Sequence, residues 1–254
     1  MRGTISSHSI LGRKCSIYLP PDYVSGKGSF PVAYLLGESN ITPIMNSVES
    51  RMEDPARRKS GCRQFILFAL EATDWERDFS PWRDKEPPAQ TKFTGGAGAF
   101  LSTLKSKIIP QINSAYRTVR DAQDTVLAGY SLAGLAALYG MFTQDFAMRI
   151  ASVSGSLWYP KWTDWAATQS LPAATSAGAS YRVYMSLGRD EKTTNNPLMA
   201  TVETCTEKTY RIIQSKLDQL GQNSGDNLFF EYNPGNHFTD VAERTAKALV
   251  FLES

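Results

Sequence analysis

The stretch 125-TVLAGYSLAGLAALYG-140 carries the pattern from which the fold can be inferred. Its β-branched and apolar start is typical of a buried strand, and its later run of Leu and Ala is typical of a helix. Between the two, Gly129-Tyr-Ser-Leu-Ala133 sets Ser131 in a sharp turn, with a small residue two positions to either side. Larger side chains there would clash as the strand bends back. The stretch therefore predicts a serine held in a strained, tight strand-to-helix turn.

This turn matches the nucleophile elbow of an α/β-hydrolase fold, and Ser131 is its predicted nucleophile. The usual pattern is G-x-S-x-G, and here the last position is Ala133, where a methyl group can still fit. The alternative is a plain helix cap, because serines often cap the first turn of a helix without any chemistry. An activated serine, unlike a cap, needs a base and an acid from elsewhere in the chain.

Composition narrows the class of protein. The chain has 254 residues, 42% hydrophobic and 20% charged, as in an ordinary globular domain, and we expect one α/β domain over residues 1–254. A net charge of +2 gives no reason to expect nucleic acid or a membrane as a partner, and the basic run 57–59 is interpreted as a solvated loop. The N-terminus has no long apolar run, so we expect no signal peptide or membrane anchor and a cytoplasmic location. Three isolated cysteines argue against a disulfide framework and against structural zinc.

Apolar and helical segments alternate along the chain without internal repeats. Besides the elbow strand, strands are predicted at 14–19, 31–36, 64–70, 149–154, 181–187 and 227–232. Besides the elbow helix, helices are predicted at 41–52, 97–116 with a kink or break at Pro110, 197–220 and 240–252. Long aromatic loops are expected at 71–96 and 155–165. The alternation predicts a mainly parallel sheet covered by helices on both faces.

A serine nucleophile needs a general base, and the chain contains only two histidines. His8 lies in a polar N-terminal stretch that we place at an exposed edge. His237 lies in Asn233-Pro-Gly-Asn-His237, a turn-rich loop between the last predicted strand and the last predicted helix. Because catalytic groups in such sheets gather outside the carboxyl ends of the strands, His237 is the predicted base.

The acid of a triad should follow a strand that lies between the serine and the histidine in the chain. The strand 181–187 is followed by Gly188-Arg-Asp190-Glu191, which offers two adjacent carboxylates. Glu191 is the first candidate and Asp190 the reserve, although either could instead be solvated or paired with a neighbouring Arg or Lys. Asp164, in the second aromatic loop, is a third candidate.

An oxyanion hole needs two backbone N–H donors. Leu132, directly after the nucleophile, should supply one, and Gly37 or Glu38, after the strand 31–36, the other. Gly37 could equally be only a turn glycine. Aromatic side chains also fall in the loops that follow strands, and they could line an acyl or aryl pocket or simply pack the loops onto the body. These residues are Trp75, Trp82, Trp158, Tyr159 and Trp162.

Six segments from Trp75 to the C-terminus resemble a known family in their sequence and joint order. They are Trp75–Trp82, Phe93–Gly96, Ala128–Gly134, Ser152–Trp158, Leu187–Thr193 and Asn233–Phe238. The pattern is similar to the putative esterase family of α/β-hydrolases, which includes siderophore (enterochelin-type) esterases and esterase D-like enzymes.

The resemblance implies a serine hydrolase acting on a small carboxylic ester, such as a siderophore ester, without a metal or organic cofactor. It carries Ser131 and His237 over as nucleophile and base. Aligning on Glu191-Lys-Thr193 favours Glu191 as the acid, although some siderophore esterases work with a Ser–His pair alone. Three other functions stay open: an acyltransferase on the same fold, a catalytically silent binding module, and a peptidase, since a fold does not fix the leaving group. The oligomeric state is not predicted.

Overall fold

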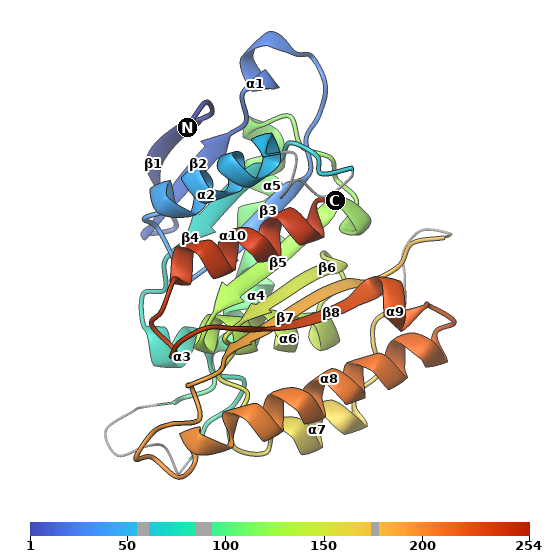
Figure 1. Cartoon of the computed structure of the whole chain (residues 1–254). Coiled ribbons are helices and arrows are strands. Elements are labelled where there is room, and N and C mark those ends of the chain that lie inside the picture. The colour runs from blue at the N-terminus through green and yellow to red at the C-terminus, as the bar shows by residue number, and fades with distance from the viewer. Residues whose placement is uncertain (55–60, 85–92, 174–177) are drawn as a thin grey trace.

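The computed structural model describes residues 1–54, 61–84, 93–173 and 178–254, and the basic run 57–59 lies outside them. Within the described residues, an eight-stranded sheet has the order β1-β2-β4-β3-β5-β6-β7-β8 (Figure 1). The strands are β1 Thr4–Ile10, β2 Arg13–Leu19, β3 Val32–Leu36, β4 Ile66–Leu70, β5 Thr125–Tyr130, β6 Arg149–Val153, β7 Arg182–Gly188 and β8 Leu228–Asn233. The six strands β3 to β8 run parallel to one another. At one edge, β2 pairs antiparallel with β4, and β1 pairs antiparallel with β2.

Helices cover both faces of the sheet. They are α1 Asp22–Ser25, α2 Thr42–Glu53, α3 Trp75–Phe79, α4 Ala97–Thr103, α5 Ile109–Ala115, α6 Leu132–Thr143, α7 Trp162–Thr168, α8 Val202–Gln219, α9 Ser224–Asn227 and α10 Val241–Leu252. On one face α2 and α10 lie side by side, and Met45 and Leu249 join a core with Val126 from the sheet (Figure 1). The other face carries α4, α6 and α8 over a larger core that includes Leu101 and Leu138. The predicted α/β fold with a mainly parallel, two-faced sheet is confirmed.

The composition of the central strands explains why the sheet lies between two layers of helices. β3 (VAYLL) and β4 (ILFAL) are apolar throughout and buried at every position, as parallel strands covered on both faces must be. Each strand predicted from the sequence is present within two residues of its predicted ends. The carboxyl ends of β3 and of β5 to β8 therefore meet at one edge of the sheet, and the loops that follow these strands can combine their side chains there.

The long helix predicted at 97–116 is divided into three pieces. A π-helical turn at Leu104–Ile108 joins α4 to α5, whose second residue is Pro110. Proline cannot donate to the preceding turn, and a widened turn accommodates the lost bond. The predicted kink or break near Pro110 is therefore present as a change from α-helical to π-helical turns.

Six elements differ from the sequence prediction. β1 was predicted only as a polar stretch, yet it pairs with β2 along its whole length, from Thr4 with Leu19 to Ile10 with Arg13. Four short helices were not predicted: α3 and α7 begin in the segments expected to be loops, and α1 and α9 lie in connections between other elements. The long helix α8 begins at Val202 instead of the predicted proline at 197. Among the described residues, no helix combines the length and apolar character needed to cross a bilayer.

Candidate active site

Ser131 occupies a strained turn between β5 and α6. Its backbone has φ 59° and ψ −125°, a conformation that a non-glycine residue adopts only when its surroundings enforce it. The flanking residues explain how the turn closes. A Cβ atom at Gly129 would lie 2.3 Å from the carbonyl oxygen of Ala133, so only glycine fits there. The predicted elbow is thus present in its backbone geometry.

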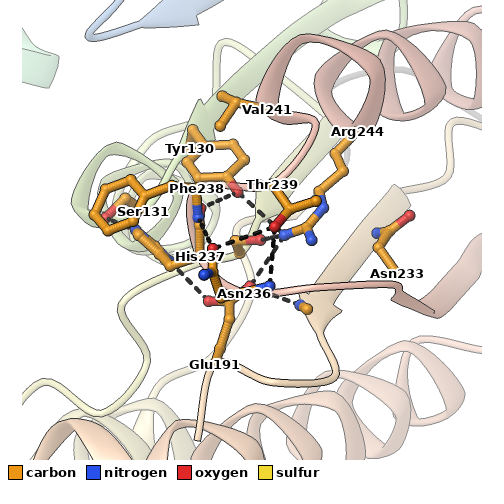
Figure 2. A network of polar contacts seen from close by, with 12 residues as sticks. Tyr130, Ser131, Glu191, Asn233, Asn236, His237, Phe238, Thr239, Val241 and Arg244 are labelled. Atoms are coloured by element: carbon orange, nitrogen blue, oxygen red, sulfur yellow. Dashed lines mark hydrogen bonds and ion pairs between the residues drawn. The ribbon is translucent and has the colours of Figure 1, made fainter. Parts of the chain in front are cut away.

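His237 lies beside Ser131, in the middle of the loop that joins β8 to α10 (Figure 2). Its Nε2 atom is 2.9 Å from the hydroxyl oxygen of Ser131. Two hydrogen bonds fix the loop on either side of the ring: the hydroxyl of Tyr130 donates to the His237 carbonyl at 2.7 Å, and the amide of Phe238 donates to the side chain of Asn236 at 2.9 Å. These bonds fix the backbone at residues 237 and 238, and with it the position from which the His237 ring reaches Ser131.

Glu191 completes a chain of three side chains. Its Oε2 atom is 2.7 Å from Nδ1 of His237, and its side chain is only 3% exposed. The other oxygen, Oε1, accepts the backbone amide of Gly188 at 2.6 Å. Burial opposes ionisation of this carboxyl, but the hydrogen bonds from His237 and Gly188 outweigh it and lower the pKa of Glu191. The carboxylate of Glu191 is thus ionised at neutral pH.

The other two candidate acids make no hydrogen bond or ion pair with His237 in the part of the chain that the structure describes. Asp190 is exposed, and its backbone amide donates to the carbonyl of Gly235 at 3.1 Å. Asp164 is on α7, where its side chain is 78% exposed and pairs with Lys208 at 3.0 Å. Of the three candidate acids, only Glu191 has its carboxylate beside His237.

One of the two predicted sources of the second oxyanion donor is wrong. The amide of Gly37 donates to the carbonyl of Leu70 at 2.8 Å, which extends the pairing of β3 with β4, so it is not free for substrate. Glu38, the next residue, is the candidate that is left. Leu132 is the first residue of α6, where amides have no intrahelical acceptor.

A cavity of about 490 Å³ opens over these groups, and Ser131 and His237 are both in its lining. Its aromatic wall includes Trp75, Phe93, Trp158 and Phe238. Met199, in the turn before α8, and Val202, the first residue of α8, add apolar side chains. Phe238 is 83% exposed, which is unusual for a large apolar side chain and places it where a ligand could cover it.

Three of the predicted pocket residues do not line this cavity: Trp82, Tyr159 and the fully buried Trp162. Trp82 and Tyr159 pack edge to face, with ring centroids 5.7 Å apart, and the Tyr159 hydroxyl donates to the Trp82 carbonyl at 2.5 Å. The Trp82 ring nitrogen donates to the carbonyl of Pro160 at 3.2 Å. These two aromatic residues hold one loop against another, whereas Trp75 and Trp158 reach the cavity.

The family can now be assigned. A family model described as "Putative esterase" matches residues 10–238 of the chain. The chain belongs to this family. The predicted resemblance is confirmed, and the class of activity is that of a carboxylic ester hydrolase.

Individual proteins similar to this esterase support the same fold. An uncharacterized protein of Bacillus subtilis (strain 168), YbbA, is 28% identical over 193 residues, which cover 75% of this chain and 74% of that protein. An IroE-like serine hydrolase from Shewanella oneidensis superposes with a TM-score of 0.69 at 19% identity, over 99% of this chain and 79% of that one. The enterobactin esterase FES from Shigella flexneri, solved with enterobactin, gives a TM-score of 0.66 at 17% identity, over 99% of this chain and 59% of that one.

Several residues of the site were not predicted from the sequence of the esterase. Phe93 and Phe238 sit in two of the family segments, so their place there could have signalled the cavity. Ser156 lies in a third such segment, and its hydroxyl is 3.3 Å from that of Ser131. Arg244, which contacts Glu191, carried no signal, because a single arginine in an amphipathic helix has no distinctive pattern.

Proposed function

We propose that this esterase cleaves its substrate through an acyl-enzyme intermediate on Ser131. The observation that supports this most directly is the continuous hydrogen-bonded chain from the Ser131 hydroxyl through His237 to Glu191, with distances of 2.9 and 2.7 Å. Glu191 favours the imidazole tautomer with its proton on Nδ1, which leaves Nε2 free to accept the proton of the serine.

The reaction then proceeds in two halves. Ser131 attacks the ester carbonyl while His237 takes its proton, and the amides of Leu132 and Glu38 stabilise the oxyanion. As the tetrahedral intermediate collapses, its bond to the alcohol breaks and His237 gives that proton to the departing alcohol. The acyl group stays bonded to Ser131. A water molecule, deprotonated by His237, releases the acid in the second half.

The cavity favours a neutral ester with an aromatic or apolar acyl group. Trp75, Trp158 and Phe238 line it with aromatic side chains. The charged side chains among the described lining residues are all carboxylates, including Glu76 and Asp190. An anionic substrate would be repelled by these groups. The Shigella flexneri enterobactin esterase has also been solved with 2,3-dihydroxy-N-benzoyl-serine, whose aromatic ring is of the kind that this cavity could hold, and for this chain we propose an uncharged ester that carries such a ring.

Substitution of the nucleophile and base tests this mechanism. Ser131→Ala and His237→Ala should each lower kcat for a p-nitrophenyl ester by about 10⁶-fold, because the two groups act as one unit. Ser102→Ala and His8→Ala, at exposed positions on α4 and β1, are the matched controls and should keep full activity. Full turnover by either Ser131→Ala or His237→Ala, with folding intact, would falsify the mechanism.

The same assay separates hydrolysis from its rivals. Added alcohols would intercept the acyl group faster than water in an acyltransferase, and a silent binding module would not label at Ser131 with a fluorophosphonate. We expect labelling of Ser131 and release of free acid as the main product.

We further propose that residues 1–254 act as one domain in the cytoplasm. The single continuous sheet and the three cysteines without a disulfide framework support this. Recovery of the protein in the membrane or secreted fraction of its source cells would contradict it.

A further inference from the structure

We propose that Arg244 is the positioning residue of this active site. It holds Glu191, and the histidine loop (residues 234–240, which carry His237), in the correct position relative to Ser131. The inference rests on the proposed function, since it assigns a role within that mechanism. Arg244 does not line the cavity, so it acts through other residues and not on the substrate.

The guanidinium of Arg244 is buried at the centre of a polar network (Figure 2). It reaches from α10, and its side chain is 1% exposed. Its Nη1 atom lies 3.3 Å from Oε1 of Glu191, 3.2 Å from the Ser154 hydroxyl and 3.3 Å from the Tyr130 hydroxyl. Its Nη2 atom donates to the carbonyl of Pro234 at 2.6 Å.

These four partners come from four neighbouring strands of the sheet. Tyr130 is the last residue of β5 and directly precedes Ser131, while Ser154 directly follows β6. Glu191 is in the loop after β7, and Pro234 directly follows β8. One side chain therefore ties together the ends of the strands that carry the nucleophile, the acid and the histidine loop.

Glu191 is the partner for which this matters most. One of its oxygens must face Nδ1 of His237, and a carboxylate held at a single point could rotate away from it. The Gly188 amide and Arg244 both contact the other oxygen, Oε1, so the plane of the carboxylate is fixed. The two protons of Nη1 are shared among three acceptors at nearly equal distances, so the cation contributes its charge as well as hydrogen bonds.

A second connection runs from Arg244 to the base itself. The Tyr130 hydroxyl receives a contact from Nη1 and donates its own proton to the His237 carbonyl at 2.7 Å. The fork of the guanidinium is needed for this arrangement, because one nitrogen faces Glu191 and Tyr130 while the other faces Pro234. A lysine ammonium is a point charge and cannot reach both sides.

A double-mutant cycle distinguishes positioning from a merely structural role. In the full-length enzyme, Arg244→Met should lower kcat for a p-nitrophenyl ester by about 10²-fold, with kcat/KM falling equally, as a displaced catalytic group does. In the Glu191→Gln background the same substitution should cost less than about threefold, because the carboxylate that Arg244 holds is no longer there. Equal losses in the two backgrounds would overturn the inference.

Controls separate this result from misfolding and from failure of the proposed function. Rates are normalised to the fraction of Ser131 that labels with a fluorophosphonate, and wild-type labelling is measured first, since its absence would refute the mechanism and not the role of Arg244. Arg149→Met, at the opposite end of β6, is the matched loss of a partly buried arginine and should leave kcat unchanged. Should Arg244→Met not fold, Arg244→Lys takes its place in the cycle, and the same dependence on Glu191 is expected.

Discussion

The two oxygens of Glu191 have different surroundings, and this division explains how one buried carboxylate can serve a neighbouring histidine. Oε1 is held by the Gly188 amide and Arg244, while Oε2 is left to His237. Loss of the charge should therefore affect the histidine before it affects the fold.

Glu191→Gln should lower kcat by about 10³- to 10⁴-fold. The amide keeps the shape of the side chain but no longer stabilises the imidazolium or selects the productive tautomer of His237. Steady-state rates with an activated aryl ester measure the effect, and Asp164→Asn, an exposed carboxylate on α7, is the matched control. A Glu191→Gln enzyme with nearly full kcat would mean that the Ser–His pair works alone.

At the level of single residues, the sequence pointed to the three side chains that the structure joins by hydrogen bonds, and to little else. Ser131 and His237 stood out because the elbow motif is specific and only two histidines exist. Gly37 was predicted wrongly because the direction of a backbone amide depends on strand pairing, which the identity of a residue does not reveal. Arg244 was missed since its partners come from loops far apart in the sequence.

The elbow is the element on which the site depends most, because a tight turn keeps Ser131 clear of both β5 and α6. Its two small flanking residues are not equivalent. Gly129 faces the backbone of Ala133, whereas Ala133 already carries a methyl group in the place where the usual motif has glycine.

Gly129→Ala should destabilise the esterase by about 3 kcal/mol or more, because the new methyl would lie 2.3 Å from a backbone oxygen that cannot move aside. Ala133→Gly should cost only about 1 kcal/mol, the usual penalty of glycine in a helix, and should keep kcat. Urea unfolding monitored by tryptophan fluorescence gives both values. Equal stability of Gly129→Ala and the wild type would show that the turn is looser than its geometry indicates.

Among the elements, those with strong periodicity or continuous apolar runs were predictable and those made of polar or mixed residues were not. β1 (TISSHSI) is mostly exposed along its length, so it has no apolar face to reveal it. α3 begins at a capping aspartate, Asp74, whose side chain accepts the amide of Arg77 at 3.0 Å. That cap was readable in principle, but two tryptophans and several prolines nearby favoured the interpretation as a loop.

On the scale of the whole molecule, the two edges of the sheet carry different charged groups. The hydrogen-bonded chain of Ser131, His237 and Glu191 lies at the carboxyl edge. Arginines gather at the amino edge, where Arg149 and Arg182 are the first residues of β6 and β7. The alternation of strands and helices predicted this layered, mainly parallel sheet. The position of β4 between β2 and β3 was not predictable, because it depends on which strands pair across a crossover.

At the amino edge, Glu253 is fully buried, and its surroundings favour the protonated acid. Arg63 contacts its carboxylate at 3.1 Å but also bonds Asp124, while Arg149 and Arg182 donate to backbone carbonyls of the last residues instead. Burial is thus only partly offset by these arginines, and it raises the pKa of Glu253 to about 7.

Between pH 4.5 and 7 the folded protein therefore keeps a proton on Glu253 that the unfolded chain has released, so stability must fall as the pH rises through this range. The free energy of unfolding of the wild type, minus that of Glu253→Gln, should drop by about 3 kcal/mol between pH 4.5 and pH 8. Urea unfolding of both proteins across this range measures the difference, which cancels the titration of other groups. Glu207→Gln, an exposed carboxylate on α8, should show no such trend. A difference that rises with pH would mean that the arginines outweigh burial and keep Glu253 ionised.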